Sequence, residues 1–198
     1  MTTFVLATHN QHKVDEFRGI LAQEVPGFEL VTYDGPEPVE DGDTFEANAL
    51  IKARAAAAHT GMPAMADDSG IAVDALQGAP GILSARWAGE PKSDARNLAL
   101  VLEQLEGVAE SQRGASYVCA IAVVYPASET QPAREFTVEA RWSGHLLTEP
   151  RGTNGFGYDP IFVPDGLSLT SAELEPERKN AMSHRTRALA LVAARLNG

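Results

Sequence analysis

Hydrophobic and polar positions recur along the chain with two different periods, which predicts both strands and helices. Residues 117–125 form an almost continuous apolar run, typical of a strand that is buried on both faces. Residues 136–142 instead alternate between apolar and polar, which predicts a strand with one buried face. The apolar positions of this second strand are Phe136, Val138, Ala140 and Trp142. Because the two strands follow each other closely, we expect them to pair as a long antiparallel hairpin.

Helical spacing of apolar residues predicts further elements, with helices at residues 12–23, 44–59, 93–105 and 183–196. Shorter apolar or β-branched runs predict strands at residues 4–8, 28–33, 62–66 and 71–76. Thr44 and Gly61 are placed to cap the second helix at its start and its end. This mixed order indicates an α/β or α+β fold with a mixed sheet and flanking helices. No repeat or linker divides the sequence, so we expect residues 1–198 to form one domain.

The composition narrows the possible functions. The chain of 198 residues carries a formal net charge of −11, which argues against a nucleic-acid polymer as partner because such binding requires basic patches. No apolar run approaches the roughly 18 residues of a membrane span, so we expect no membrane partner. The single cysteine, Cys119, cannot form an internal disulfide and lies in the predicted buried strand. We therefore expect a core cysteine in a protein of the reducing cytoplasm.

The charge is unevenly distributed along the chain. Residues 34–46 contain six acidic residues and no basic one, whereas residues 178–198 contain five basic residues and no acidic one. Such runs are most often a solvated loop and the basic face of a helix. Alternatively, the first run supplies carboxylates for a metal ion and the second supplies cations for a small polyanion.

Residues 8–13 have a composition suited to binding phosphate. They follow a predicted strand and begin a helix, where backbone N–H groups favour anions. Thr8 and Asn10 add hydrogen-bond donors and Lys13 adds a full positive charge. The alternative is a capped surface helix with a solvated lysine.

Asp67 and Asp68 end a predicted strand, just before Ser69 and Gly70. Neighbours in a regular strand point to opposite faces, so the two carboxylates should not act as one clamp unless the backbone turns there. One of them can face a site, because Mg²⁺ is often bound by one or two carboxylates together with substrate phosphates. The alternative is an Asx-type turn.

Two later segments offer contacts for a nucleobase. Phe156 lies between two glycines within residues 153–160, and an aromatic ring on such a loop can stack on a base, worth on the order of 1–3 kcal/mol. Lys179 and the Ser-His-Arg sequence at residues 183–185 add donors near the start of the final helix. The alternatives are a core-facing aromatic ring and a solvated basic helix start.

In this order and spacing, the segments resemble the inosine triphosphate pyrophosphatase family, hydrolases of non-standard purine nucleoside triphosphates. The resemblance covers essentially the whole chain. Its motifs are T-H-N-Q-H-K at 8–13, E-D-G-D-T-F at 40–45, N-A-L-I-K-A at 48–53, A-D-D-S-G at 66–70, G-A-P-G-I-L-S-A-R at 78–86, G-F-G-Y-D-P at 155–160 and S-H-R at 183–185. Each motif alone is weak, and their joint occurrence is specific.

The resemblance implies an α/β fold with two lobes around a nucleotide cleft, usually in a homodimer. It implies Mg²⁺-dependent hydrolysis of ITP, dITP or XTP between the α- and β-phosphates, which yields the nucleoside monophosphate and pyrophosphate. On this resemblance, residues 8–13 bind phosphates, Glu40 and Asp68 hold the magnesium, and Asp68 also activates the water. The remaining implied substrate contacts are Ser69, Phe156, Gly157, Tyr158, Asp159, Lys179, His184 and Arg185.

One position departs from the pattern of the family. The residue before the asparagine of the F-x-E-N-A stretch is usually acidic, and here it is Ala47. Glu46 lies one residue earlier, about 100° away around a helix, so it is not an automatic substitute. Two other functions stay open: a pyrophosphatase of modified pyrimidine triphosphates, and a nucleotide sensor that binds without hydrolysis. The presence of Glu40 and Asp68 argues against the sensor.

Overall fold

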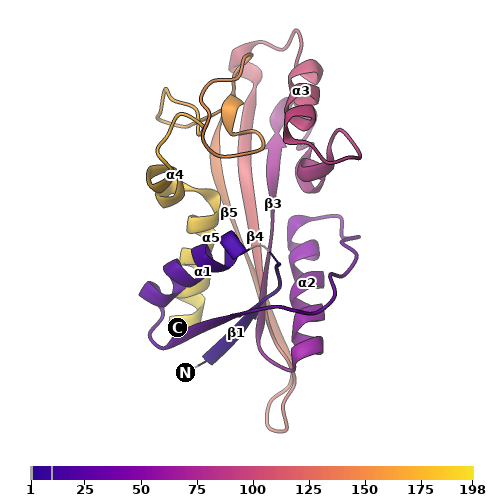
Figure 1. Cartoon of the computed structure of the whole chain (residues 1–198), viewed down its shortest axis with the longest axis vertical. Coiled ribbons are helices and arrows are strands. Elements are labelled where there is room, and N and C mark those ends of the chain that lie inside the picture. The colour runs from indigo at the N-terminus through magenta and orange to yellow at the C-terminus, as the bar shows by residue number, and fades with distance from the viewer. Residues whose placement is uncertain (1, 10) are drawn as a thin grey trace. The chain divides into compact units, whose positions relative to one another are not determined.

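The computed structural model describes residues 2–9 and 11–198 of the chain. The strands in this part are β1 (Thr2–Leu6), β2 (Phe28–Thr32), β3 (Ala64–Val73), β4 (Gly114–Tyr125), β5 (Arg134–Leu146) and β6 (Phe162–Pro164). The helices are α1 (Gln11–Glu24), α2 (Phe45–Thr60), α3 (Asp94–Gln104), α4 (Pro176–Met182) and α5 (His184–Asn197). The described strands join in one mixed sheet in the order β2-β1-β3-β4-β5-β6 (Figure 1). The predicted α/β fold with a mixed sheet is confirmed.

The chain forms two compact units, and each draws on separate stretches of sequence. Unit 1 comprises Met1–Asp68, Cys119–Ala140 and Thr186–Gly198. Unit 2 comprises Ser69–Val118 and Arg141–Arg185. The long strands β3, β4 and β5 and the helix α5 therefore contribute residues to both units.

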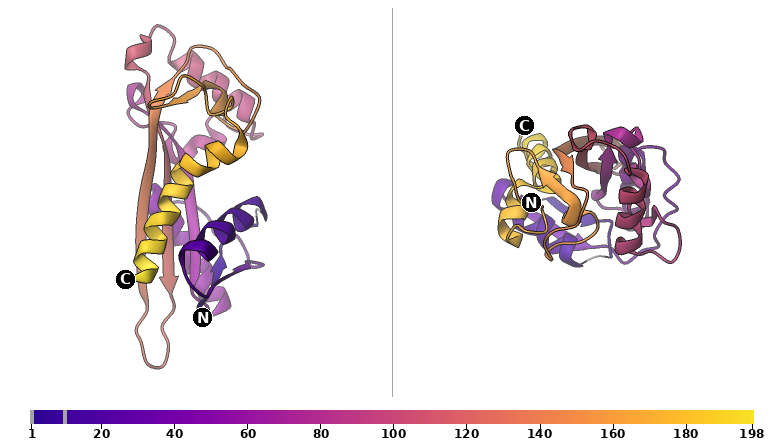
Figure 2. Two further views of the ribbon diagram at one scale, coloured as in Figure 1. Left: turned by 90° about the vertical axis from the view of Figure 1, so that its left-hand side faces the viewer. Right: turned by 90° about the horizontal axis from the view of Figure 1, so that it is seen from above.

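Unit 1 has helices on both faces of its strands. On one face, Phe4 of β1, Met65 of β3 and Cys119 of β4 pack with α1 and α5. On the other face, Val5 of β1 and Ala64 of β3 pack against an alanine-rich side of α2. Side chains alternate between the faces of a strand, so the same strands serve both layers. In the left-hand view of Figure 2, α1 and α5 lie in front of the strands of unit 1.

Unit 2 has its own hydrophobic core. It is formed by residues of β3, α3, β4, β5 and β6, with Trp142, Ile161 and Phe162 among its large buried side chains. Trp142 belongs to this core, whereas Phe136, Val138 and Ala140 of the same strand pack on the core of unit 1. The apolar positions of β5 therefore all contact a hydrophobic core, that of unit 1 near the start of the strand and that of unit 2 further along it.

Most predicted elements are confirmed within a few residues. Thr44 caps the start of α2 by accepting a hydrogen bond from the Ala47 amide, and Gly61 ends the helix in the left-handed conformation. The strands β4 and β5 are neighbours in the sheet, and the connection at residues 126–133 is too short for a parallel crossover, so they form the expected antiparallel hairpin. Cys119 is fully buried, as predicted.

One prediction about the strands is wrong, and two short elements were not predicted. Residues 62–66 and 71–76 do not form two separate strands, because β3 runs unbroken from Ala64 to Val73. Burial on both faces and pairing with its neighbours keep the turn-prone Asp-Asp-Ser-Gly sequence extended. The helix α4 and the short strand β6 were not expected, since both are too short to show a period. Within the described part of the chain, none of the helices has the length and apolarity needed to cross a membrane.

Candidate active site

The parallel pairing of β1 with β3 brings Thr8 and Lys13 near Asp67. Leu6 lies opposite Met65, and the Ala7 amide donates to the Met65 carbonyl at 2.8 Å. The strand β1 ends there, while β3 continues through Asp67 and Asp68. The turn into α1 therefore begins at the carboxyl end of a parallel strand, the end at which ligands bind in open α/β sheets.

Lys13 and Asp67 form a close ion pair at this end of the sheet. The Lys13 Nζ lies 2.9 Å from each carboxylate oxygen of Asp67. The Asp67 side chain is only 2% exposed, whereas that of Lys13 is 28% exposed. The lysine thus compensates a buried charge and still reaches solvent, where it can meet an anionic ligand.

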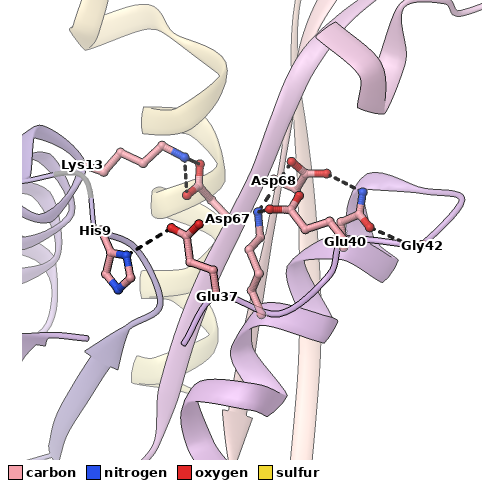
Figure 3. Close-up of polar contacts among 9 residues, drawn as sticks. His9, Lys13, Glu37, Glu40, Gly42, Asp67 and Asp68 are labelled. Atoms are coloured by element: carbon pink, nitrogen blue, oxygen red, sulfur yellow. Dashed lines mark hydrogen bonds and ion pairs between the residues drawn. The ribbon is translucent and has the colours of Figure 1, made fainter. Parts of the chain in front are cut away.

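Asp68 faces the other side of β3 and contacts residues of α2. The Lys52 Nζ lies 3.7 Å from Asp68 Oδ1 and 3.2 Å from Oε1 of Glu40 (Figure 3). Glu40 belongs to the acid-rich segment at residues 34–46, which we call the acidic loop. The predicted alternation of Asp67 and Asp68 is confirmed, and the Asx-turn alternative is wrong because the strand does not turn. We call Lys13, Glu40, Lys52, Asp67 and Asp68 the carboxylate–lysine cluster.

Asn48 supports this cluster from within α2. Its side chain is 1% exposed. The side-chain Nδ2 donates to Asp68 Oδ2 at 3.1 Å, and Oδ1 accepts from the Gly42 amide at 2.9 Å. Sequence reasoning assigned no role to Asn48 or Lys52, although both stand in the N-A-L-I-K-A motif. Their spacing of four residues places them on one face of a helix, and this spacing is the feature of the sequence that could have identified them.

The environment of Asp68 changes its proton affinity. Burial raises the pKa of this carboxyl above its ordinary value, while the Lys52 charge and the Asn48 hydrogen bond oppose the rise. The negative charges of Glu40 and Asp67 add to it. A carboxylate with a raised pKa is a stronger base once it is ionised, so Asp68 is suited to accept a proton from water.

A polar cavity lies beside the cluster, within unit 1. Its lining residues are Ala7, Thr8, Lys13, Tyr33, Glu37, Pro38, Glu40, Lys52 and Asp67. The structure thus brings together the predicted residues Thr8, Lys13 and Glu40. Asn10, the third predicted donor of residues 8–13, lies outside the described residues. His9, which was assigned no role, contacts Glu37 and stacks on Tyr33.

The donor set of the cluster fits a magnesium ion that is shared with a substrate. Among residues 2–9 and 11–198, no group of three His, Cys, Asp or Glu residues could hold a metal ion by itself. Glu40 and Asp68 nevertheless both direct a carboxylate oxygen toward one positive charge, the Lys52 ammonium. Mg²⁺ is commonly held by one or two carboxylates with phosphate oxygens completing its shell. Glu40 and Asp68 are the residues that could hold it.

Unit 2 contains a second cavity, which we call the aromatic pocket. Its lining includes the predicted substrate contacts Ser69, Phe156, Gly157, Tyr158, Asp159, Lys179, His184 and Arg185. The other lining residues are Gly70, Ile71, Ser84, Ala85, Asp94 and Tyr117. All the contacts implied by the resemblance for these later segments therefore meet around one cavity.

Two aromatic surfaces in this pocket have different exposures. The Phe156 side chain is 69% exposed, with the Lys179 Nζ 5.2 Å from its ring centroid. A core-facing Phe156 was the alternative interpretation, and it is wrong. Tyr117 of β4 stacks on His184, with ring centroids 5.0 Å apart and ring planes 12° apart. Phe156 is thus available for a flat ligand, while His184 is held in place by Tyr117.

Asp159 lies beneath the exposed loop and is 1% exposed. Its Oδ1 accepts hydrogen bonds from the Ser171 hydroxyl at 2.8 Å and from the Tyr117 hydroxyl at 3.2 Å. Its Oδ2 accepts from the Phe156 amide at 2.8 Å and from the Lys179 ammonium. The carboxylate therefore joins the aromatic loop, Lys179 and Tyr117 in one buried network. Sequence reasoning missed Tyr117 and Ser171, because only tertiary contact brings them to Asp159.

Tyr158 and Gly157 attach the loop to neighbouring segments of unit 2. The Tyr158 hydroxyl donates to the Ser84 carbonyl at 2.8 Å, and burial raises the pKa of this phenol well above its ordinary value. The Gly157 amide donates to Asp94 Oδ2, 3.0 Å away at the start of α3. The loop beside Phe156 is therefore tied on both sides, which limits the positions its ring can adopt.

Comparison with known proteins places the chain among enzymes of nucleotide metabolism. A dITP/XTP pyrophosphatase from Leifsonia xyli is 57% identical over 97% of this chain and 94% of its own length. A HAM1 protein from Coxiella burnetii superposes with a TM-score of 0.90 at 42% identity and covers 100% of this chain and 99% of its own. A dITP/XTP pyrophosphatase structure from Mycobacterium abscessus gives a TM-score of 0.81 at 48% identity, over 96% and 98% of the two chains.

The family model described as the Ham1 family matches residues 4–195. This match spans all seven motifs on which the resemblance to inosine triphosphate pyrophosphatases was based, and that resemblance is confirmed. The chain belongs to the Ham1 family.

Proposed function

We propose that this protein is a dITP/XTP pyrophosphatase that hydrolyses non-standard purine nucleoside triphosphates to the monophosphate and pyrophosphate. The observation that carries the proposal is the near-full-length similarity to relatives named for that activity. The geometry supports it in chemical terms, since the chain has a carboxylate–lysine cluster suited to a polyphosphate and an aromatic pocket suited to a base.

The residues of the cluster have different roles in hydrolysis of the triphosphate. Thr8 and Lys13 bind phosphate oxygens, with Lys13 adding a positive charge that reduces the electrostatic barrier to attack by water. Asp68 orients the water and accepts its proton, for which its raised pKa is suited. Lys52 keeps the oxygens of Glu40 and Asp68 near one cation before the substrate arrives. Asn10 is proposed as a further phosphate donor.

Mg²⁺ is the proposed cofactor, with Glu40 and Asp68 as its protein ligands. When bound, the ion would supply positive charge that stabilises the departing pyrophosphate. The cluster has two such carboxylates directed at one cationic group, while the carboxylate of Asp67 is paired with Lys13. A substrate phosphate would complete the coordination, so nucleotide should tighten the weaker metal binding that the two carboxylates give alone.

The aromatic pocket selects the base. The exposed Phe156 ring stacks on the purine, while Ser69, Gly157 and Tyr158 shape the rest of the contact. Lys179, His184 and Arg185 donate hydrogen bonds to the 6-oxo group and neighbouring acceptors. Adenine carries an amino group at position 6, so it would leave those donors unpaired, at a large cost in binding free energy. Asp159 contributes by holding Lys179 and the Phe156 loop, since its own oxygens already accept four hydrogen bonds.

The test is an assay of ITP, XTP, dITP, ATP, GTP, dUTP and modified pyrimidine triphosphates with Mg²⁺, in which pyrophosphate and orthophosphate are measured separately. We expect ITP, dITP and XTP to yield pyrophosphate and monophosphate, and ATP and GTP to react much more slowly. Release of orthophosphate alone would mean cleavage at the γ-phosphate and contradict the proposal. A clear preference for dUTP or modified pyrimidine triphosphates would favour the pyrimidine alternative.

We also propose that the protein acts in the cytoplasm as a homodimer, as the family resemblance implies. Light scattering coupled to size-exclusion chromatography measures the mass directly. A particle of twice the chain mass of 21.1 kDa is expected, and a monomer at micromolar concentration would contradict the dimer.

A further inference from the structure

The buried side chain of Asn48 uses both ends of its amide to join two parts of the cluster. At one end, Oδ1 accepts the amide proton of Gly42 with a heavy-atom distance of 2.9 Å. At the other end, Nδ2 donates to Asp68 Oδ2 at 3.1 Å (Figure 3). The side chain is 1% exposed, so water does not compete for either hydrogen bond. One residue of α2 therefore contacts both the acidic loop and β3.

The orientation of this amide follows from its partners. The backbone N–H of Gly42 can only donate, so it must face the oxygen of the Asn48 side chain. The NH₂ group is then directed at Asp68, whose ionised carboxylate can only accept. Because both contacts agree, the amide has one satisfied orientation, in which its NH₂ group holds one oxygen of Asp68. The Oδ1 atom of Asp68 is the oxygen nearest Lys52.

The contact between Gly42 and Asn48 depends on the absence of a side chain at position 42. A Cβ atom at position 42 would lie 2.8 Å from Asn48 Oδ1 and 2.8 Å from the Ala47 Cβ, closer than real Cβ atoms come to other atoms. The acidic loop can therefore approach α2 this closely only with glycine there. Since Gly42 is two residues after Glu40, the hydrogen bond to Asn48 also fixes the loop that carries Glu40.

We propose that Asn48 is a positioning residue that sets the separation and orientation of Glu40 and Asp68. It holds the Glu40 loop through Gly42 and the Asp68 carboxylate through Oδ2, so that the remaining oxygens converge near Lys52. This inference rests on the proposed function, because it assigns Asn48 a part in preparing the metal-binding and water-activating carboxylates. Partners that orient metal ligands typically contribute about 10–100-fold in metal affinity or activity.

The test compares Asn48→Ala and Asn48→Asp with the unmodified protein. Asn48→Asp keeps an acceptor for the Gly42 amide but replaces the donor to Asp68 with a carboxylate. For both variants we expect kcat for ITP to fall by about 10–100-fold with a change in KM of less than about 3-fold. We expect Mn²⁺ binding without nucleotide, measured by electron paramagnetic resonance, to weaken by a similar factor. Unchanged Mn²⁺ affinity and kcat in Asn48→Ala would overturn the proposal.

Asn97 provides a matched control. It is also 1% exposed, and its Oδ1 accepts the Ala88 amide at 2.8 Å, but it belongs to unit 2 and does not line the aromatic pocket. Asn97→Ala leaves the Ala88 amide without its acceptor and should lower thermal stability, while leaving kcat and Mn²⁺ affinity unchanged. Equal losses of kcat in the two variants would mean that Asn48 acts only through stability, which also overturns the proposal.

Gly42→Ala tests the same arrangement if the Asn48 variants do not fold. Its backbone φ is not in the left-handed region, so the substitution changes only the space beside Asn48. We expect a lower kcat and weaker Mn²⁺ binding, because the Glu40 loop must move away from α2. Full activity in Gly42→Ala would contradict the positioning of Glu40. If the unmodified protein hydrolyses no nucleotide, the proposed function fails, and the Mn²⁺ measurement still decides the role of Asn48.

Discussion

The two cavities use acidic residues in opposite ways. In the carboxylate–lysine cluster, Asp68 is buried near the negative charges of Glu40 and Asp67. These surroundings disfavour its ionised form and raise its pKa. In the aromatic pocket, Asp159 accepts hydrogen bonds from four donors and is deeply buried. The first arrangement is poised to accept a cation or a proton, whereas the second only organises its neighbours. Burial of an aspartate alone therefore does not identify a catalytic acid or base.

Removing the proposed base should have the largest effect on activity. Asp68→Asn cannot accept a proton from water, and general-base catalysis contributes about 10²–10⁴-fold, so we expect kcat for ITP to fall by that factor. Nucleotide binding should stay measurable by calorimetry, because the aromatic pocket is unchanged. Turnover equal to that of the unmodified protein would exclude the role assigned to Asp68.

Removing the acid of the aromatic pocket should instead reduce stability. Asp159→Asn places an NH₂ group against hydrogen-bond donors and leaves Lys179, which is 14% exposed, without its counter-charge. Breaking a buried pair in this way costs about 3 kcal/mol. Urea unfolding should show this loss, while Asp68→Asn should lose less, because burial disfavours the ionised Asp68 carboxylate and Glu40 still pairs with Lys52. A loss of stability in Asp68→Asn as large as in Asp159→Asn would contradict the comparison.

Truncation of the exposed ring should weaken binding without affecting the fold. Stacking of a base on an aromatic side chain is worth about 1–3 kcal/mol, so Phe156→Ala should raise KM for ITP by roughly 5–100-fold. Because Phe156 is 69% exposed, we expect little change in the melting temperature. Phe156→Tyr keeps a ring and serves as the control. An unchanged KM in Phe156→Ala would count against stacking.

The pH dependence of stability tests whether the pKa of Asp68 is raised in the folded protein. The folded-state pKa of Asp68 is raised, so its ionised form destabilises the native state at neutral pH. As the pH falls through that pKa, protonation removes the penalty. The stability of the unmodified protein relative to Asp68→Asn should therefore rise as the pH falls from neutral into acid, as measured by thermal unfolding in EDTA.

Glu135→Gln is the control of opposite sign. A hydrogen bond from Arg54 lowers the pKa of Glu135, so its contribution to stability is present above its ordinary pKa and is lost as the pH falls. The unmodified protein should lose stability relative to Glu135→Gln on acidification, while it gains relative to Asp68→Asn. If the stability difference changed with pH in the same direction in both comparisons, Asp68 would not be the group that causes the expected pH dependence.

The sequence predicted much of this arrangement because the informative signals were local. Alternation along β3 predicted that Asp67 and Asp68 face opposite sides, and they do contact different lysines. The same reasoning could have included Lys52 and Asn48, which share a helix face. It could not have predicted the roles of Ser171 and Tyr117. These residues are 12 and 42 positions away from Asp159 in the sequence, and their contact with it depends on how the core of unit 2 packs. Nor did a period reveal α4, which is a short helix of seven residues.

Substitution of Ala47, the position that departs from the family pattern, should have the smallest effect. Ala47 is the third residue of α2, and its amide donates to the N-cap Thr44 at 3.1 Å. An acid here would complete a capping box by accepting from the Thr44 amide. Ala47→Glu should therefore raise stability by about 0.5–1 kcal/mol, measured by urea unfolding, with kcat within about twofold.

Ala47→Gln separates the cap from the charge, because glutamine can complete the same capping box without adding a carboxylate near Glu40 and Asp68. A similar gain in both variants would assign a structural role to the acid that the family resemblance implies at this position. If Ala47→Glu raised kcat tenfold and Ala47→Gln did not, the acid would have a catalytic role that this chain lacks. The retained pair of Glu40 and Asp68 near Lys52 argues for the structural outcome.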